Sequence, residues 1–304
     1  MNELNSVCQQ WVAYLKGGKG LSAHTLKAYQ QDWNQFIFFF QNYLGNSPSF
    51  KILKSLKPSD LRAWLADRHK EGLQSRSTAR SVSSIKNFFY YLRQQNLIEH
   101  HSIFDLKPPK LKKTLPRPLS VEQIDVLLNE IHQVSCEPWV GQRDRSLFML
   151  IYSGGLRISE ALSLRYQDTK SMDYLTILGK GQKFRKVPFL ERVKNELEKY
   201  CNLCPYSFED STFLFYGLKG RRLSSVAAEY QMRRYRKLMG LPDWVTPHAL
   251  RHSCATHLME NSGNLRAIQE LLGHASLSTT QIYTDINQDY LFKEYSKAHP
   301  RSKI

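Results

Sequence analysis

The sequence predicts an α-rich α+β fold with a helical N-terminal domain and a mixed C-terminal domain. The chain has 304 residues, which is too long for one small module and suits two domains. Apolar residues recur at helical spacing within residues 1–104, whereas a glycine-containing turn between strand-like runs lies further along the chain. A proline-rich break at 105–118 separates the two parts, so the second domain is expected to span 119–304.

Residues 1–104 show helical patterns only. One helix is expected between a capping Ser22 and about Leu44, a second starts at Ser59–Asp60, and a third holds apolar residues from Val82 to Leu92. The first of these is rich in aromatic residues at helical spacing. Such stripes belong to a core more often than to a ligand site, so we interpret them as the core of a small helical bundle.

The break between the domains is rich in proline and positive charge. Residues 107–118 contain four prolines and five basic residues without any periodicity, which predicts an extended linker. The charge suits a strap that lies against phosphates, although a plain solvated linker fits the composition equally well.

Beyond the linker, helical and strand-like patterns are mixed. A β-hairpin is expected from residues 172–178 and 184–189 around the turn at Gly179–Gln182, with a third short strand at Thr212–Tyr216. Helices are expected near residues 120–132, 141–153, 224–239, 247–260, 265–272 and 278–296.

The charge balance indicates a polyanionic partner. The chain has 43 Lys and Arg against 27 Asp and Glu, a net charge of +16 that both predicted domains share. Nucleic acid is the favoured partner, and an anionic membrane surface is the alternative, which no lysine-rich amphipathic helix supports. The sequence has neither an apolar run of about 18 residues nor a secretory signal, so we expect a cytoplasmic protein.

The cysteines do not indicate a disulfide framework. Five are scattered along the chain, which predicts no set of disulfides. Cys201 and Cys204 form a CxxC pair without a second pair at finger spacing, so two half-buried thiols are expected rather than a zinc site.

A segment near residue 250 has the features of an anion site at a helix start. Thr246 suits the N-cap and Pro247 the first helical position. His248 and Arg251 then share one face, whereas His257 lies on the opposite, apolar face and is expected in the core. The helix dipole and unpaired N–H groups at this end favour a phosphate, and a plain surface His/Arg pair is the alternative.

Other chemistry-bearing residues follow turns. Arg157 comes after a glycine pair that allows a tight turn, and Glu160 lies where it can pair with an arginine. Lys180 lies between two glycines at the hairpin tip, where a solvated turn lysine is the alternative. His274 follows the end of a predicted helix, and Tyr283 lies one turn into a helix that starts with a capping box. Taken alone, Tyr283 fits a core position better than a site.

Four blocks of sequence together resemble the catalytic domain of the tyrosine recombinases, the integrase family. In family order they are GGLRISEALSL (154–164), LGKGQKFRKVP (178–188), TPHALRHSCATHL (246–258) and ELLGHASLSTTQIYT (270–284). The resemblance covers essentially the whole chain, because the helical N-terminal part and the basic linker resemble the family's SAM-like core-binding domain and hinge. Within the family the chain is most similar to the Xer recombinases of the XerC and XerD type.

The resemblance implies a transesterification that needs neither a cofactor nor a metal ion. A tyrosine attacks the DNA phosphate and holds it as a 3′-phosphotyrosyl intermediate, so that the ends are rejoined without an external energy source. The implied roles are nucleophile for Tyr283, general acid for Lys180, phosphate clamp for Arg157 and Arg251, hydrogen bonds to phosphate oxygens for His248 and His274, and support of Arg157 for Glu160.

The resemblance also implies partners and a biological setting. The protein would close as a C-shaped clamp on double-stranded DNA with paired sites, beside a homologous second recombinase or copies of itself in a tetrameric synapse. It would contact the cell-division DNA translocase FtsK and resolve chromosome dimers at cell division. The end of the chain, residues 285–304, has apolar residues at Ile286, Tyr290, Leu291 and Tyr295. It is expected to dock onto a neighbouring protomer, with folding back onto its own domain as the alternative.

Other functions remain open from the sequence. An integrase of a phage, integron or transposon would use the same residues on other DNA sites, and a type IB topoisomerase shares the chemistry without synapsis. A non-catalytic DNA-binding protein on this fold would be expected to lack Tyr283 or an arginine, and neither is lacking. Ala249, Cys254 and residues 262–264 depart from the family pattern at non-catalytic positions, which bears on partner choice or site preference rather than on activity.

Overall fold

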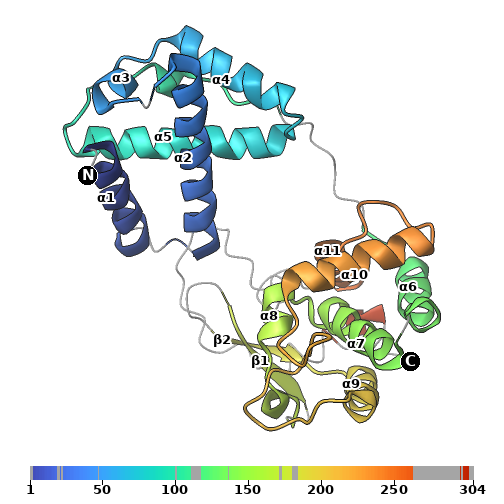
Figure 1. Ribbon diagram of the computed structural model, residues 1–304. Coiled ribbons are helices and arrows are strands. Elements are labelled where there is room, and N and C mark those ends of the chain that lie inside the picture. The colour runs from blue at the N-terminus through green and yellow to red at the C-terminus, as the bar shows by residue number, and fades with distance from the viewer. Residues whose placement is uncertain are drawn as a thin grey trace. The chain divides into compact units, whose positions relative to one another are not determined.

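The computed structural model describes most of the chain. The described residues are 3–18, 21, 23–46, 48–99, 101–110, 118–135, 137–170, 173–179, 184–262, 295 and 297–300. The chain divides into two compact units, residues 1–114 and 115–304, each with its own hydrophobic core (Figure 1). Within the described residues, no helix has the length and apolarity that crossing a membrane requires.

The first unit is built from helices, in agreement with the predicted fold. Its elements are α1 (Glu3–Gly17), α2 (Ala23–Leu44), α3 (Phe50–Lys54), α4 (Pro58–Lys70), α5 (Ser75–Gln94) and the short 3-10 helix η1 (Ser102–Asp105). Helix α4 begins slightly earlier than expected. Lys57 occupies its N-cap, and the Lys57 backbone N–H donates to the Asp60 carboxylate at 2.8 Å, which closes the first turn.

Aromatic side chains fill the core of this unit, as predicted. Trp33, Phe36 and Phe40 of α2 are buried, as are the apolar residues of α5 between Val82 and Leu92. Trp11 of α1 packs edge-on against Phe88 of α5, with ring centroids 5.3 Å apart. The stripe of aromatic residues therefore forms the core of the bundle.

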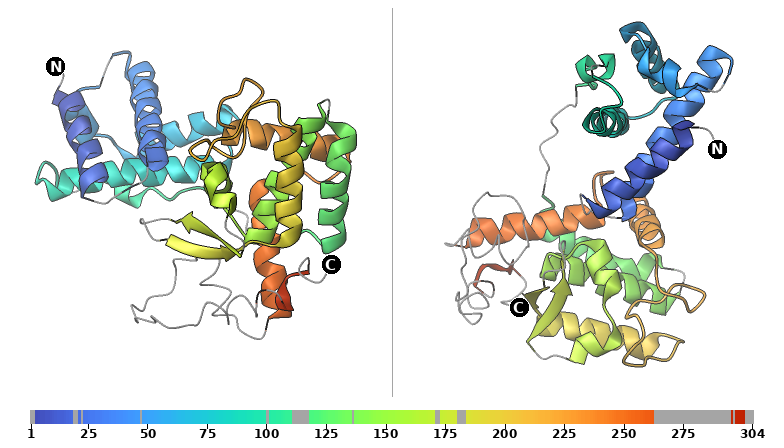
Figure 2. Two further views of the ribbon diagram at one scale, coloured as in Figure 1. Left: turned by 90° about the horizontal axis from the view of Figure 1, so that it is seen from below. Right: turned by 90° about the vertical axis from the view of Figure 1, so that its left-hand side faces the viewer.

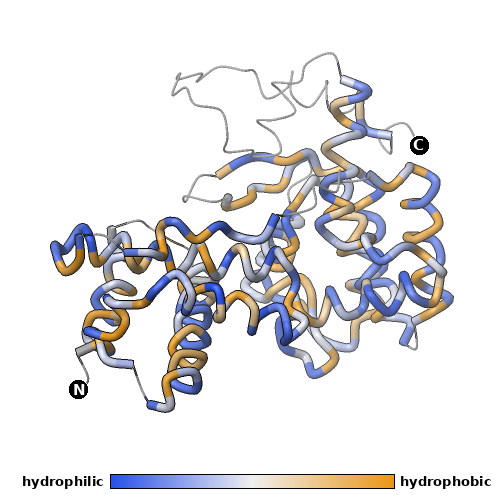
Figure 3. The backbone as a smooth tube through the Cα atoms, turned by 90° about the horizontal axis from the view of Figure 1, so that it is seen from above, coloured by the Kyte–Doolittle hydropathy of each residue, from blue (hydrophilic) through white to orange (hydrophobic). Residues whose placement is uncertain are grey.

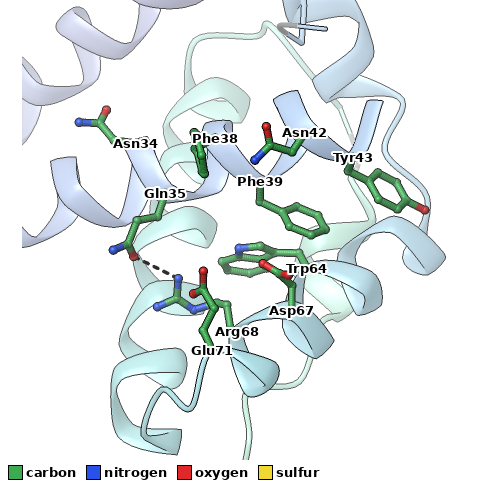
Figure 4. A pocket seen from close by; sticks show the side chains of 10 residues that line it. All are labelled: Asn34, Gln35, Phe38, Phe39, Asn42, Tyr43, Trp64, Asp67, Arg68 and Glu71. Carbon is green, nitrogen blue, oxygen red and sulfur yellow. Dashed lines mark hydrogen bonds between the residues drawn. The ribbon is translucent and has the colours of Figure 1, made fainter. Parts of the chain in front are cut away.

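A buried charge links three helices of the first unit. Asp32 of α2 is fully buried and accepts hydrogen bonds from the Ser81 hydroxyl at 2.6 Å and the Arg80 guanidinium at 2.9 Å. Arg68 of α4 donates to Ser81 at 3.0 Å and to Gln35 at 3.1 Å. These partners offset the cost of burying the Asp32 carboxylate. A pocket lined by residues of α2 and α4 opens beside Arg68 (Figure 4).

The second unit contains helices around a single hairpin. Its described elements are α6 (Val121–Val134), α7 (Pro138–Gly154), α8 (Ile158–Ser163), the 3-10 helix η2 (Tyr166–Lys170), β1 (Tyr174–Leu178), β2 (Phe184–Pro188), α9 (Glu191–Leu203), α10 (Ser225–Leu238) and α11 (Pro247–Asn261). Strands β1 and β2 pair antiparallel, with Leu178 opposite Phe184 at the turn. This pairing confirms the predicted hairpin.

Helix α7 lies at the centre of the second unit. It packs against α6, α9 and α11 (Figure 2). Almost every residue from Val140 to Gly154 is buried. Hydrophobic and hydrophilic residues alternate along the surrounding helices, as an amphipathic pattern requires (Figure 3). The C-terminal end of α7 is therefore a fixed point, and the candidate site is built directly after it.

The expected strand at Thr212–Tyr216 does not form. This segment makes only isolated bridges, from Phe213 to Arg165 and from Tyr216 to Arg222. Both partners lie outside β1 and β2, so no ladder extends from either pair. The prediction of a third strand is wrong. The segment has the residue types of a strand, but its Leu214 and Phe215 side chains pack into the core without a partner strand beside them.

Two helices of this unit differ from the sequence-based expectations. Helix α7 begins at Pro138, three residues before its predicted start, because proline suits the first helical position. Helix α9 was not predicted, although its residues Val193, Leu197 and Tyr200 are buried at helical spacing. The predicted helices at 265–272 and 278–296 lie outside the described residues.

The end of the chain folds back onto its own unit. Tyr295 is buried and its hydroxyl donates to the Ser153 carbonyl, while the Asn261 amide donates to the Ala298 carbonyl at 3.0 Å. The ring of His299 stacks on Tyr295 with centroids 5.1 Å apart. The partners of these residues belong to the same unit, as the fold-back alternative expects, and docking of the chain end onto a neighbouring protomer stays a prediction. Residues 285–294 lie outside the described ones.

Candidate active site

The site begins at the turn after α7. Gly155 caps this helix in the left-handed conformation with φ 57°, which a residue without a Cβ adopts without strain. The turn places Arg157 at the N-cap of α8, where its backbone N–H donates to Glu160 Oε2 at 2.8 Å. The Arg157 guanidinium returns to Glu160 Oε1 at 2.7 Å. The predicted pairing of Glu160 with an arginine is present.

Helix α11 brings a second arginine to the same carboxylate. Arg251 is buried, donates to the Gly155 carbonyl and has its Nη1 3.6 Å from Glu160 Oε2. Burial, followed by the positive charge of Arg157, lowers the pKa of Arg251 to about 10. The guanidinium therefore remains charged at neutral pH. The sequence places Arg251 on a polar helix face, and the structure shows that the Arg251 side chain is covered by protein.

The start of α11 is built as predicted. The Thr246 side chain accepts from the Ala249 backbone N–H at 3.1 Å, and Pro247 is the first helical residue. His248 lies exposed on this first turn, one turn before Arg251. Partial desolvation of the ring, and then the charge of Arg251, lower the pKa of His248 below its usual value. The ring is therefore neutral at pH 7 and has one N–H to donate.

The opposite face of α11 belongs to the core. Leu250, Cys254 and Leu258 are buried, and His257 is buried with its Nδ1 3.0 Å from the Tyr152 hydroxyl. The interpretation of His257 as a core histidine is confirmed. This packing fixes the rotation of α11 and with it the direction of Arg251.

A third arginine, which the sequence analysis missed, binds Glu160 from the hairpin. Arg185 of β2 donates from Nη1 to Oε1 at 3.0 Å and from Nη2 to Oε2 at 2.8 Å. Two parallel bonds of this kind are the preferred geometry between arginine and carboxylate. One signal was present in the sequence. Arg185 lies two positions before the apolar Val187, so the two residues share one face of the strand.

These groups make a positively charged site around one ionised carboxylate. Burial alone would raise the pKa of Glu160, but hydrogen bonds from Arg185 and Arg157 hold it at about 2. Three guanidiniums therefore surround a single negative charge at neutral pH. Partly buried planar donors with an excess of positive charge suit a phosphodiester and the charge that builds on its oxygens during substitution at phosphorus.

The structure describes four of the seven residues proposed from the sequence. Glu160 lies between the side chains of Arg157 and Arg251, and His248 precedes Arg251 on the same helix. Lys180, His274 and Tyr283 lie outside the described residues. Among the described residues, no group of three or more His, Cys, Asp or Glu side chains is arranged to hold a metal ion.

Comparisons with known families match both units. A model of the phage integrase family matches residues 117–289, and a model of the phage integrase N-terminal SAM-like domain matches residues 8–96. Tyrosine recombinase XerC of Rhodospirillum centenum is 43% identical over 97% of this chain and 87% of its own length. Tyrosine recombinase XerC of Rickettsia prowazekii is 37% identical over 99% of this chain and 98% of its own length.

Solved structures show the same fold. The XerH site-specific recombinase, bound to a palindromic difH substrate in a post-cleavage complex, has a TM-score of 0.65 and 25% identity over 96% of this chain and 83% of that chain. The Tn1549 transposon integrase, in complex with circular intermediate DNA, has a TM-score of 0.67 and 22% identity over 98% of this chain and 97% of that chain. With these matches over nearly its whole length, the chain belongs to the phage integrase family and is a tyrosine recombinase.

Proposed function

We propose that this recombinase cuts and rejoins double-stranded DNA at paired specific sites in the manner of a Xer recombinase. The observation that carries the proposal is the cluster of Arg157, Arg251 and Glu160, which provides charged forks for a phosphodiester. The similarity to XerC proteins along nearly the whole chain supports the same function.

The proposed reaction uses seven residues of this chain. The Tyr283 phenolate attacks phosphorus, the bond to the 5′ oxygen breaks and that oxygen takes a proton from Lys180, and the 3′ phosphate stays bound to the tyrosine. The guanidiniums of Arg157 and Arg251 neutralise the charge on the non-bridging oxygens, and Glu160 orients them. His248 donates its N–H to one of these oxygens, and His274 is assigned the same role. Attack by a different 5′ hydroxyl then completes strand exchange.

The proposal extends to partners and setting. We infer that two pairs of recombinase protomers assemble on two DNA sites, with either copies of this chain or a second homologous recombinase. The proposed role is the resolution of chromosome dimers at cell division, under the control of the translocase FtsK. Because its DNA substrate is then the chromosome, we infer that the protein acts in the cytoplasm. The domain boundaries proposed for this function remain 1–104, 105–118 and 119–304.

An integrase of a mobile element is the second candidate. The Tn1549 transposon integrase shares the fold, but its identity of 22% is far below the 43% of the XerC protein from Rhodospirillum centenum. The difference favours the Xer function. The two candidates differ in their DNA sites rather than in the chemistry of the arginine cluster.

A nicked DNA substrate tests the proposal. When the cleaved strand carries a nick just beyond the scissile phosphate, the short 5′ product diffuses away and the covalent protein–DNA adduct accumulates. We expect an adduct that resists denaturation, formed in the presence of a chelator, on candidate chromosomal sites. An adduct only on the ends of a mobile element would favour the integrase candidate, and no adduct on any site would contradict both.

A further inference from the structure

The Glu160 carboxylate is saturated with hydrogen bonds. Its two oxygens accept four bonds, from the backbone N–H and Nη1 of Arg157 and from Nη1 and Nη2 of Arg185. An ionised carboxylate offers about four acceptor positions. Arg251 is left at 3.6 Å, which is beyond hydrogen-bond distance although still within reach of the charge.

Arg157 and Arg185 differ in how much of the side chain reaches solvent. The Arg157 side chain is 40% exposed, whereas that of Arg185 is 12% exposed. Both terminal nitrogens of Arg185 point to Glu160, while Arg157 uses one of its two. Arg157 can therefore meet a ligand with its remaining donors, and Arg185 is turned toward the carboxylate.

We propose that Arg185 is a positioning residue of the recombination site, which acts through Glu160 on Arg157 and Arg251. By occupying two acceptor positions of Glu160, it keeps that carboxylate from turning toward Arg251. The carboxylate is then fixed in the orientation in which it accepts from Arg157 and lies 3.6 Å from Arg251. The inference deepens the proposed function and rests on it.

Arg185 also joins separate elements of the second unit. It lies on β2, the strand that follows Lys180 in the sequence, whereas Glu160 lies on α8 and Arg251 on α11. Its bond to Glu160 is therefore a long-range contact between the hairpin and the helix turn that starts the site. A lysine at this position would keep the charge but would lose the planar fork that holds both carboxylate oxygens.

The first test measures the rate of adduct formation at saturating protein on the nicked substrate, with DNA affinity measured separately. We expect Arg185→Gln to slow adduct formation by about 10- to 100-fold, as loss of a residue that orients an active-site group does elsewhere. DNA affinity should stay within about threefold, because the arginines that face the DNA are still present. Arg185→Lys should fall between wild type and Arg185→Gln.

A matched ion pair in the same unit provides the control. Arg145 of α7 pairs with Glu196 of α9 at 2.8 Å, and its side chain is 12% exposed, the same as Arg185. Arg145→Gln removes an equally covered charge that contacts no residue of the site. We expect it to lower the melting temperature about as much as Arg185→Gln while the rate of adduct formation stays unchanged. Equal rate losses in both variants would reduce Arg185 to a purely structural role.

A double-mutant cycle separates action through Glu160 from direct contact with the phosphate. If Arg185 acts through Glu160, the variant with both Arg185→Gln and Glu160→Gln should be no slower than the slower single variant. If Arg185 binds the phosphate itself, the two rate losses should multiply, and the proposal would be overturned.

A substrate change adds a readout that a folding defect does not move. Replacing one non-bridging oxygen of the scissile phosphate with a methyl group removes the charge that Arg157 and Arg251 neutralise. The defect of Arg185→Gln should shrink on this methylphosphonate, and an unchanged defect would contradict action through the clamp. Wild-type protein that forms no adduct would refute the proposed function, whereas normal wild-type activity with an equally active Arg185→Gln variant would refute this inference alone.

Discussion

At the scale of single residues, Glu160 carries the electrostatics of the site. Burial opposes its ionisation, yet hydrogen bonds from Arg185 and Arg157 hold its pKa at about 2, against an ordinary value of 4.5. The folded pKa is thus below the unfolded one. Ionised Glu160 therefore adds stability that is complete above pH 4.5 and is lost as the pH falls toward 2.

This shift predicts a pH-dependent effect of Glu160→Gln. The variant should have a lower melting temperature than wild type at pH 7, because three arginines lose their counter-charge. The difference between the two proteins should shrink as the pH falls below about 4.5. Thermal melts followed by circular dichroism from pH 7 to pH 3 measure it, and a difference that does not change with pH would contradict the account.

Lys180 has a separate prediction, based on its proposed role as the general acid. Lys180→Ala should slow cleavage of an ordinary phosphodiester strongly, because the leaving alkoxide then lacks a proton. A substrate with a 5′-bridging sulfur should relieve the defect, since a thiolate departs without one. Cleavage rates on the two substrates, at equal DNA occupancy, measure this. Equal defects on both substrates would show that Lys180 positions DNA instead.

The sequence reveals local contacts of the site and misses the long-range ones. Arg157 and Glu160 are three residues apart around a glycine turn, so their pairing follows from helix-start geometry. Arg185 is 25 residues from Glu160, and its contact depends on how β2 packs beside α8. The burial of Arg251 likewise depends on the packing of α11, which no local pattern specifies.

At the scale of elements, the fold-back of the chain end has a measurable consequence. Tyr295 is fully buried in its own unit, so Tyr295→Ala should destabilise the isolated protein by about 3 kcal/mol. Tyr230, a tyrosine of α10 that is 60% exposed, is the matched control and should tolerate alanine with little change. Urea unfolding of the three proteins tests this. Unchanged stability, with loss of cooperative binding to two adjacent sites, would instead support docking onto a neighbour.

Periodic elements were predictable and isolated extended segments were not. Helices α2, α4 and α5 of the first unit, the hairpin and α11 follow from apolar spacing and caps, whereas α1 and α3 were not predicted. Thr212–Tyr216 has the composition of a strand, but a strand needs a partner, and its neighbours form only single bridges. Helix α9 has few apolar residues within a highly charged segment. The helical spacing of Val193, Leu197 and Tyr200 was therefore missed in the sequence.

At the scale of the whole molecule, the charge of +16 predicts binding governed by phosphate contacts. Affinity for a DNA site should fall by about tenfold or more between roughly 50 and 200 mM salt, because neutralised phosphates release their counterions. Gel-shift or fluorescence titrations across this range measure the slope. An affinity that is nearly independent of salt would contradict electrostatic binding by this chain.

The most direct measurement of the central claim compares wild type with Tyr283→Phe on the nicked substrate. The substitution removes only the oxygen that is proposed to attack phosphorus and leaves the arginine cluster intact. We expect a denaturation-resistant DNA adduct with wild type, no adduct with Tyr283→Phe, and nearly equal DNA affinity for the two proteins. An adduct that persists in Tyr283→Phe would show that another residue is the nucleophile and would contradict the account.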